Sequence, residues 1–398
     1  MKSLSQIALL LAFICILCGC KVDKKQGGVD NPSQPLYLEL NDSDVGTLAI
    51  SISPFDGSRD TLVIDRPLTN LIVMSTSHVG FLDALNALDC ISGVSGKDFV
   101  FTSHKVLVSE DNATLGTRGG TGAERSEASG GASRSEASEP PIPYDIGYEA
   151  APDYEKIVSL KPDLLLTYAV SGAKSPFITK LKQLGIPVFI VNEHLESHPL
   201  ARASYIRLFG ALTGSMPQAD SIFNEVKEAY SLIADSIATV QKPGRKVLLN
   251  IPYNDQWFVP SSQSYLTSLI RDAGGEVLGC EEGRAASSVM SIEKAYSLSK
   301  EADCWLNVGW CTTLEQLLGV NPVFKDMVGN IQGNALKEGY GSFPVIWNDN
   351  KRVNAKGGND IWQSGVARPD LLLKDLVTVL HPDNQGDAAN TIYYRPIE

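Results

Sequence analysis

The chain has 398 residues, of which 43% are hydrophobic and 20% are charged. A chain of this length buries a large core, and we expect it to divide into two domains. The formal net charge of −12 argues against nucleic acid as a partner, because phosphates require clustered Lys and Arg side chains.

The N-terminal residues form a targeting signal rather than part of the fold. Lys2 precedes an apolar run over residues 7–17, which is too short to span a bilayer with ease. The run ends in Leu-Cys-Gly-Cys, which resembles the bacterial lipobox with Cys20 as the lipidated residue. We expect a signal peptide over residues 1–19, an ordinary secretory signal cut elsewhere being the alternative, and a flexible tether over 20–35. The mature protein would be extracytoplasmic and lipid-anchored to a bacterial membrane.

Four cysteines remain beyond the signal and Cys20, namely Cys90, Cys280, Cys304 and Cys311. An extracytoplasmic compartment permits disulfides, and four cysteines allow three pairings. These four cysteines form no CxxC motif and no Cys/His metal spacing. We favour single buried thiols, and disulfides remain the alternative.

The folded part begins with short β-prone runs. Residues 36–66 hold three such runs separated by turn residues, which predicts a small antiparallel addition before the main fold. Residues 71–75 and 91–95 then read as buried strands. Between them the pattern predicts a helix over residues 78–88, capped by residues 76–77. The three elements form a right-handed βαβ unit.

The first lobe extends over residues 67–213 and carries one irregular segment. Residues 116–139 are rich in Gly, Ser, Ala, Glu and Arg, and they contain RSEAS twice. Such a segment cannot bury enough apolar surface to offset its chain entropy, so we expect a disordered insertion. The lobe closes with a single helix over residues 202–212.

An internal repeat links the two halves of the chain. Residues 152–170 (PDYEKIVSLKPDLLLTYAV) and 291–309 (SIEKAYSLSKEADCWLNVG) share Glu-Lys-x-x-Ser-Leu, then an Asp and a buried run. Each copy predicts an amphipathic helix followed by a parallel strand. Two such units far apart suggest two similar lobes, each presenting one carboxylate, Glu155 or Glu293, at a helix start.

A long helix separates the two lobes. Residues 217–240 keep helical periodicity over about 36 Å at 1.5 Å per residue, and Pro243 lies just beyond the end. We assign residues 214–241 to this linking helix, residues 242–381 to the C-terminal lobe and residues 382–398 to a tail. The fold class is α/β, with two Rossmann-like lobes joined by one long rigid α-helix.

Ligands of open α/β sheets lie beyond the carboxyl ends of the strands. Aromatic side chains collect at these ends and in nearby loops, and a cleft lined by them suits a large, flat or apolar ligand. The predicted ligand-binding residues are Ser77, His78, Tyr148, Tyr168, Trp257, Phe258, Trp310, Trp347 and Trp362.

Catalytic interpretations find little support. The sequence contains no GxSxG, HExxH, P-loop or post-strand GxGxxG motif. His194 and His198 have metal-compatible spacing, but without a third ligand we favour solvated loop histidines. His78 could contact a ligand or cap a helix. Glu155 and Glu293 could act as an acid/base pair, but their places in separate lobes do not suit shared proton transfer. We therefore predict no enzyme, no resident metal and no cofactor.

Three segments together resemble a known family. The runs STSHVGFLDALNALDCISGVSG and YEKIVSLKPDLLLTY, with the long helix, resemble the substrate-binding proteins of cobalamin and ferric-siderophore ABC importers, the helical-backbone metal receptors, over about residues 67–382. The resemblance implies two Rossmann-like lobes with little hinge closure. It also implies that one Glu per lobe, Glu155 and Glu293, docks on arginines of a permease dimer served by an ATPase. We expect the binding protein to be a monomer.

The resemblance leaves the ligand open among a ferric siderophore, haem and cobalamin. A siderophore is usually anionic and would require a cation, for which only Lys97, Arg352 and Arg368 are plausible. The excess of aromatic side chains favours a macrocycle. The alternatives are an extracytoplasmic chelate-processing enzyme, or a surface lipoprotein that binds its ligand without a transporter.

Overall fold

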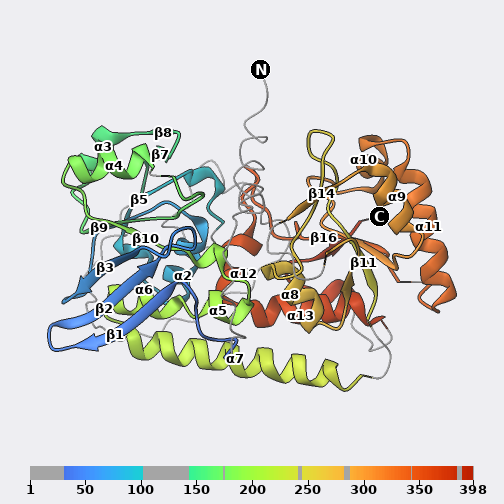
Figure 1. Cartoon of the computed structure of the whole chain (residues 1–398), viewed down its shortest axis with the longest axis horizontal. Coiled ribbons are helices and arrows are strands. Elements are labelled where there is room, and N and C mark those ends of the chain that lie inside the picture. Colours follow the sequence, from blue (N-terminus) through green and yellow to red (C-terminus); the bar gives the residue numbers. More distant parts are fainter. Residues whose placement is uncertain are drawn as a thin grey trace, which may run out of the picture.

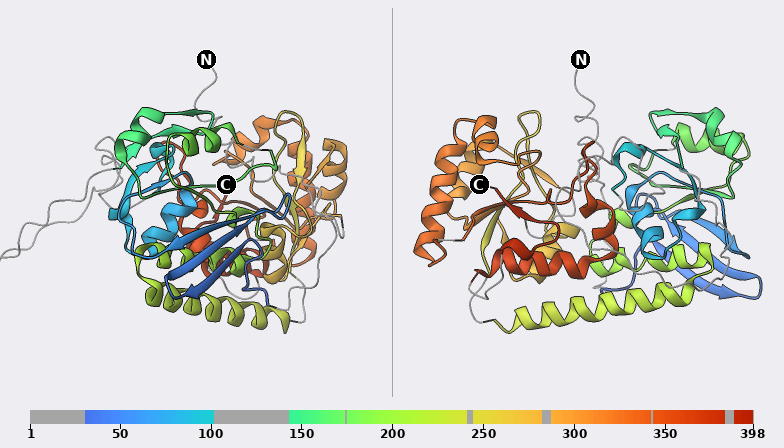
Figure 2. Two further views of the ribbon diagram at one scale, coloured as in Figure 1. Left: turned by 60° about the vertical axis from the view of Figure 1, so that its left-hand side comes forward. Right: turned by 180° about the vertical axis from the view of Figure 1, so that it is seen from behind.

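The computed structural model describes residues 31–101, 143–173, 175–240, 244–281, 287–341, 343–382 and 388–397. The predicted signal, Cys20 and the insertion over residues 116–139 lie outside these ranges. The chain forms two α/β lobes, each built around a mostly parallel five-stranded sheet, with one long helix running below both (Figures 1 and 2).

A three-stranded antiparallel sheet precedes the first lobe, in the order β1 (Leu38–Ser43), β2 (Gly46–Ile52), β3 (Arg59–Ile64). Its buried side chains, among them Leu38 and Ala49, belong to the core of the first lobe. The structure thus contains the predicted antiparallel addition. Alternating side chains give this sheet one apolar face, which packs on the lobe.

The first large sheet has the order β10-β9-β4-β5-β6 and is parallel throughout. Its strands are β4 (Leu71–Val73), β5 (Ile91–Val94), β6 (Tyr144–Asp145), β9 (Leu164–Thr167) and β10 (Val188–Ile190). Successive residues face opposite layers. Leu71 and Val73 pack with α2 (Thr76–Ala84) and α6 (Ile206–Thr213). Ile72 packs on the other face, with α3 (Tyr154–Leu160) and α4 (Pro176–Gln183).

The second large sheet has the order β13-β11-β15-β16-β17. Its strands are β11 (Lys246–Leu249), β13 (Glu276–Val277), β15 (Cys304–Leu306), β16 (Ile346–Asn348) and β17 (Arg395–Pro396). Only β17 runs antiparallel to its neighbour. One face packs with α9 (Ile292–Ser299) and α11 (Phe324–Lys337), and the other with α8 (Tyr265–Asp272) and α13 (Pro369–Leu380).

The two sheets share one topology. Without the edge strands β6 and β17, the orders are β10-β9-β4-β5 and β16-β15-β11-β13, which is the same order when each lobe's strands are numbered along the chain. Helix α3 precedes β9 and helix α9 precedes β15, at equivalent places. The sequence repeat therefore corresponds to a structural repeat.

The remaining elements connect these layers. They are the strand pairs β7 (Gly147–Tyr148) with β8 (Ala151–Pro152) and β12 (Trp257–Val259) with β14 (Ser288–Met290), the helices α5 (Pro199–Ala203), α10 (Leu314–Val320) and α12 (Ser364–Ala367), and the 3₁₀ turns η1 (Leu88–Cys90), η2 (Lys97–Phe99), η4 (Glu193–Leu195), η5 (Asp360–Trp362) and η7 (Ala388–Asn390).

Helix α7 (Met216–Ala238) has 23 residues and links the lobes, as predicted. At 1.5 Å per residue it is about 34 Å long. Phe223 belongs to the core of the first lobe, whereas Val226 and Tyr230 belong to that of the second. Seen from behind, the helix lies along the base of both lobes (Figure 2). One apolar stripe therefore serves two cores.

The lobes also exchange packing elements. Val366 and Ala367 of α12, which follows the second sheet's β16, belong to the first lobe's core. Leu200 of α5, which follows the first sheet, belongs to the second lobe's core. Helix α12 approaches α2 so closely that a Cβ added at Gly80 would lie 2.1 Å from the carbonyl oxygen of Gln363. This contact has room only for glycine.

Two helix predictions need correction. The N-cap of α2 is Ser75, whose Oγ accepts a hydrogen bond from the Ser77 amide at 3.3 Å, so the predicted cap was placed too late. The single helix expected over residues 202–212 is divided between α5 and α6. At the division the backbone hydrogen bonds change from the i to i−4 pattern of an α-helix to an i to i−3 pattern. The Tyr205 amide donates to the Arg202 carbonyl at 3.3 Å.

The C-terminal segment is not a simple tail. Tyr393 and Tyr394 are buried, and β17 adds to the edge of the second sheet. The carboxylate of Asp375 accepts hydrogen bonds from the amides of Ile392, Tyr393 and Tyr394 at 2.6–3.1 Å. A buried acceptor on α13 holds this segment, which sequence periodicity cannot reveal.

Cys90, Cys304 and Cys311 are free thiols in the described part of the chain, in agreement with the prediction of single buried cysteines. Cys90, Cys304 and Cys311 are buried, and only Cys280 is partly exposed. Burial raises the pKa of the Cys90 and Cys304 thiols to about 12, so both are poor nucleophiles at neutral pH.

We predict that Gly80→Ala destabilises the protein by about 1–3 kcal/mol, because its methyl group would overlap the Gln363 backbone. Urea unfolding would measure the loss. Gly329→Ala is the matched control, since no atom lies within 4 Å of a Cβ at that exposed site in α11, and a gain of about 0.5–1 kcal/mol is expected there. Equal stabilities of the two variants would contradict the close contact.

Candidate functional site

The most exposed aromatic side chain at a strand end is Trp310, which follows β15 and is 55% exposed. The turn around it contains two residues with positive φ, Asn307 at 59° and Gly309 at 65°. The left-handed backbone turns the chain sharply away from the sheet and leaves the indole in solvent. Trp310 thus lies where ligands of α/β sheets bind.

Three other predicted aromatic residues remain partly exposed. Tyr168 follows β9, with its ring 5.6 Å from that of His194. Tyr148 in β7 packs against Gly96, where an added Cβ would lie 2.7 Å from its ring. Trp362 in η5 lines a cavity of about 20 Å³ together with Tyr265, Asn307, Asp349 and Tyr394. That cavity has room for about one water molecule, so it is no ligand site by itself.

The remaining predicted aromatic residues are core side chains. Trp257 is 1% exposed, stacks on Trp305 at 5.7 Å and donates its indole N–H to the Leu249 carbonyl at 2.8 Å. Trp347 is fully buried and packs on Phe343. Phe258 is buried in β12. For these three positions the structure corrects the prediction, because their rings are already covered by the second lobe's own side chains.

Ser77 and His78 belong to a buried polar cluster rather than to an open surface. The Ser77 hydroxyl donates to Glu193 Oε1 at 2.5 Å, and His78 Nε2 lies 3.8 Å from Glu193 Oε2. Both residues are 2% exposed or less. Although burial opposes it, the neighbouring His194 and His78 rings, each with a nitrogen 3.8 Å from Glu193 Oε2, hold the pKa of Glu193 well below its ordinary value. The predicted contact of Ser77 and His78 with a ligand is therefore corrected.

The two loop histidines both have protein partners, and they do not share a site; only His198 is partly exposed, at 24%. His194 Nε2 donates to the Ala169 carbonyl at 3.1 Å, and its side chain is only 6% exposed. His198 Nε2 lies 3.5 Å from Asp272 Oδ2 on α8, and Tyr230 of α7 donates to the same carboxylate at 2.7 Å. Within the described ranges no three His, Cys, Asp or Glu side chains could hold a metal ion.

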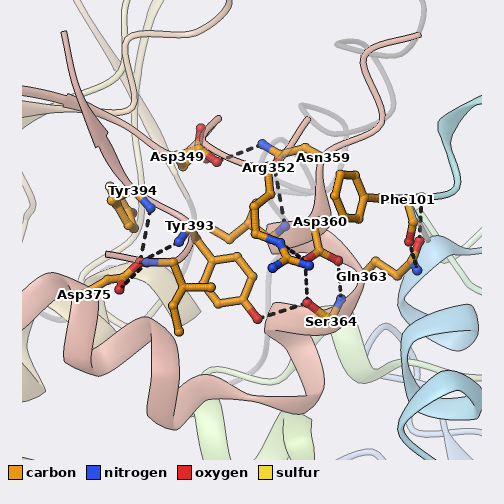
Figure 3. Close-up of polar contacts among 12 residues, drawn as sticks. Phe101, Asp349, Arg352, Asn359, Asp360, Gln363, Ser364, Asp375, Tyr393 and Tyr394 are labelled. Atoms are coloured by element: carbon orange, nitrogen blue, oxygen red, sulfur yellow. Dashed lines mark hydrogen bonds and ion pairs between the residues drawn. The ribbon is translucent and has the colours of Figure 1, made fainter. Parts of the chain in front are cut away.

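The three candidate cations differ in what they contact. Arg368 is fully engaged, because its Nε and Nη2 both donate to Asp370 at 2.9 and 2.8 Å. Lys97 is half-buried in η2, and within the described part of the chain its amine has no ion pair. Arg352 lies in the loop after β16, with Nε 2.7 Å from Asp360 (Figure 3).

The loop over residues 349–363 bridges the lobes, which the sequence did not indicate. The side chain of Gln363 accepts a hydrogen bond from the Phe101 amide at 2.9 Å and donates one to the Phe101 carbonyl (Figure 3). Asn354 donates to the carbonyls of Asp98 and Val100 at 3.0 and 3.1 Å. The sequence of this loop is rich in Asn, Gln and Gly, but this composition does not show that the side-chain amides bind residues about 260 positions earlier in the chain.

Glu155 and Glu293 occupy equivalent, exposed positions in the first turns of α3 and α9. The caps match as well, since Asp153 accepts from the Lys156 amide (2.9 Å) and Ser291 from the Lys294 amide (3.3 Å). The hydrogen bond with Ser291 lowers the pKa of Glu293. Both helices lie on the side of the molecule away from α7 (Figure 1).

The chain belongs to the periplasmic binding protein family, which matches residues 123–328. The family consists of binding proteins, so the chain is a substrate-binding protein and not an enzyme. Over the described residues, no helix has the length and apolar character needed to cross a membrane.

Two relatives and two solved structures are similar. An uncharacterized lipoprotein of Methanocaldococcus jannaschii is 26% identical over 81% of this chain and 67% of its own length. An uncharacterized ABC transporter substrate-binding lipoprotein of Bacillus subtilis is 25% identical over 29% of this chain and 37% of its own length.

A periplasmic binding protein of Veillonella parvula has a TM-score of 0.56 at 17% identity, covering 85% of this chain and 99% of its own. A periplasmic heme binding protein of Pseudomonas aeruginosa has a TM-score of 0.52 at 14% identity, covering 83% of this chain and 98% of its own. At these identities the structural likeness shows the fold alone: two α/β lobes with a linking helix.

The buried carboxylate of Glu196, near the cluster of Ser77, His78 and Glu193, makes the stability of the protein depend on pH. Glu196 accepts hydrogen bonds from the Leu36 and Tyr37 amides and the Tyr205 hydroxyl at 2.8–3.0 Å. Burial nevertheless raises its pKa from 4.5 to about 7. The protonated form is thus favoured in the folded state, and its contribution is lost as the pH rises towards 7.

We predict that the stability of the native protein relative to Glu196→Gln falls by about 3 kcal/mol between pH 4.5 and pH 7.5. Glutamine keeps an acceptor oxygen but cannot ionise. Urea unfolding of both proteins at several pH values would measure the difference, and the exposed Glu301→Gln serves as the control. A pH-independent difference would show that Glu196 ionises as an ordinary carboxyl.

Proposed function

We propose that the chain is a lipid-anchored substrate-binding protein of an ABC importer, which captures an iron chelate or a corrinoid and delivers it to a permease dimer. The observation that carries the proposal is the pair Glu155 and Glu293. Each lobe presents one exposed carboxylate in the first turn of an equivalent helix, on the side away from α7. A pseudo-two-fold pair of carboxylates suits a partner built from two copies of one subunit.

The relatives support the membrane and transporter parts of the proposal. Both are named lipoproteins, and the one from Bacillus subtilis is named an ABC transporter substrate-binding lipoprotein. Lipidation at Cys20 would place the folded part next to a permease while leaving it free to capture a ligand through a flexible tether.

The ligand class is supported by the accessible aromatic residues Trp310, Trp362, Tyr168 and Tyr148, which present flat apolar faces. Similar folds occur in proteins described as a heme binding protein and a possible iron-binding protein. We propose a ferric chelate, haem or corrinoid as the ligand, bound beyond the carboxyl ends of the strands without a resident cofactor.

We predict that Trp310→Ala weakens binding of the coloured ligand by about tenfold, because a stacked aromatic pair contributes about 0.5–1.5 kcal/mol beyond the area it buries. Absorbance titration with haem, cobalamin and ferric chelates would measure the affinity. Trp310→Phe should retain most of it, and Leu232→Ala on exposed α7 should change nothing. Unchanged affinity in Trp310→Ala would place the ligand elsewhere.

Replacing both Glu155 and Glu293 with Ala should abolish ligand uptake by cells while the affinity for ligand stays intact. Each carboxylate is expected to contact an arginine of one permease subunit. Glu228→Ala combined with Asp235→Ala, on exposed positions of α7, makes the same change in net charge and should leave uptake unaltered.

Loss of affinity in the Glu155 and Glu293 double variant would mean that these carboxylates line the ligand site. Normal uptake in that variant, or uptake that needs no permease at all, would favour a surface protein that binds its ligand without a transporter.

A further inference from the structure

We propose that Arg352 recognises an anionic group of the transported ligand, a carboxylate, phosphate or catecholate, at the junction of the two lobes. This inference rests on the proposed function and narrows its ligand class. It comes from the way the guanidinium is held, which leaves one of its edges unoccupied.

A buried carboxylate holds one edge of the guanidinium. Arg352 Nε lies 2.7 Å from Asp360 Oδ2, and Asp360 is 2% exposed. Asp360 is fixed in turn by Ser364, whose hydroxyl and amide donate to its two carboxylate oxygens at 2.7 and 3.3 Å (Figure 3). An arginine whose Nε is anchored in this way loses little further side-chain freedom when it binds a ligand.

The first lobe supports the face of the same guanidinium. Arg352 Cζ lies 5.2 Å from the centroid of the Phe101 ring, within cation–π range. Phe101 itself is held by the side chain of Gln363, which accepts its amide at 2.9 Å. The orientation of Arg352 therefore depends on residues from both lobes.

The other edge is available. The Arg352 side chain is 45% exposed, and throughout the described ranges no hydrogen bond or ion pair engages its terminal nitrogens. A guanidinium carries five N–H donors in a planar fork that matches the two oxygens of a carboxylate or phosphate. Arg352 also lies in the loop after β16, at the carboxyl edge where ligands of α/β sheets bind.

Arg368, by contrast, has its guanidinium engaged by a carboxylate of the protein. Its Nε and Nη2 both donate to Asp370, at 2.9 and 2.8 Å, so the edge that could grip a ligand is already used. The side chain is also less exposed, at 35%. The comparison separates an arginine that stabilises the fold from one prepared for an external anion.

The test titrates the purified protein with three coloured probes: haemin, which carries two carboxylates, a ferric tris-catechol complex, which is anionic, and cyanocobalamin, which has no net charge. Native protein, Arg352→Gln and Arg368→Gln are compared, and thermal unfolding checks that each is folded. We expect one anionic probe to bind stoichiometrically, with at least a tenfold higher Kd in Arg352→Gln and less than a twofold change in Arg368→Gln. Should Arg352→Gln fail to fold, Arg352→Lys keeps a cation beside Asp360, and its loss of a two-nitrogen contact should still raise Kd several-fold.

The outcomes separate the two proposals. If native protein binds only cyanocobalamin, or if the Arg352 variants bind the anionic probe as native protein does, the inference about Arg352 is overturned and the proposed function stands. If native protein binds none of the probes, the proposed function fails, and the role of Arg352 fails with it.

Discussion

The exchange of packing elements between the lobes is the constraint on which the rest of the structure depends. Helix α12 contributes Val366 and Ala367 to the first lobe's core, and α5 contributes Leu200 to the second. The first exchange is possible because Gly80 lets the Gln363 backbone approach α2 closely. Separating the lobes would expose apolar surface in both cores at once, and the hydrophobic effect therefore opposes their separation.

A fixed arrangement of lobes has consequences for both candidate surfaces. The Arg352 guanidinium depends on Phe101 from the other lobe, so its orientation is set before any ligand arrives. The pair of His198 with Asp272 and the bond from Tyr230 tie α5, α7 and α8 together in the same way. The separation between Glu155 and Glu293 is likewise fixed, and a partner with two equivalent contact points could then recognise the protein in one step. Preorganisation of this kind reduces the entropy lost on binding.

Local patterns predicted a large part of this fold. The alternation of strands and helices, the small antiparallel sheet, the long α7 and the repeated α3 and α9 follow from periodicity and caps, which act over a few residues. The division between α5 and α6, the strand β17 and the burial of Trp257 and Trp347 could not be predicted. Each depends on contacts with distant segments, such as the Asp375 carboxylate that holds the amides of the C-terminal segment.

The candidate site shows the same division between local and distant causes. The rule that ligands bind at carboxyl ends of strands points to the segments after β15 and β16, where Trp310 and Arg352 lie. It cannot tell an aromatic ring that faces solvent from one that fills a core: Trp310, after β15, is exposed, whereas Trp257, in β12 after β11, is buried. Nor can it tell a saturated arginine from an available one. That difference lies in two carboxylates: Asp370 takes two nitrogens of Arg368, whereas Asp360, which also accepts from Ser364, takes only Nε of Arg352. Which arginine keeps an edge available is therefore set by how its neighbouring carboxylate holds it, and that is a property of the folded loops.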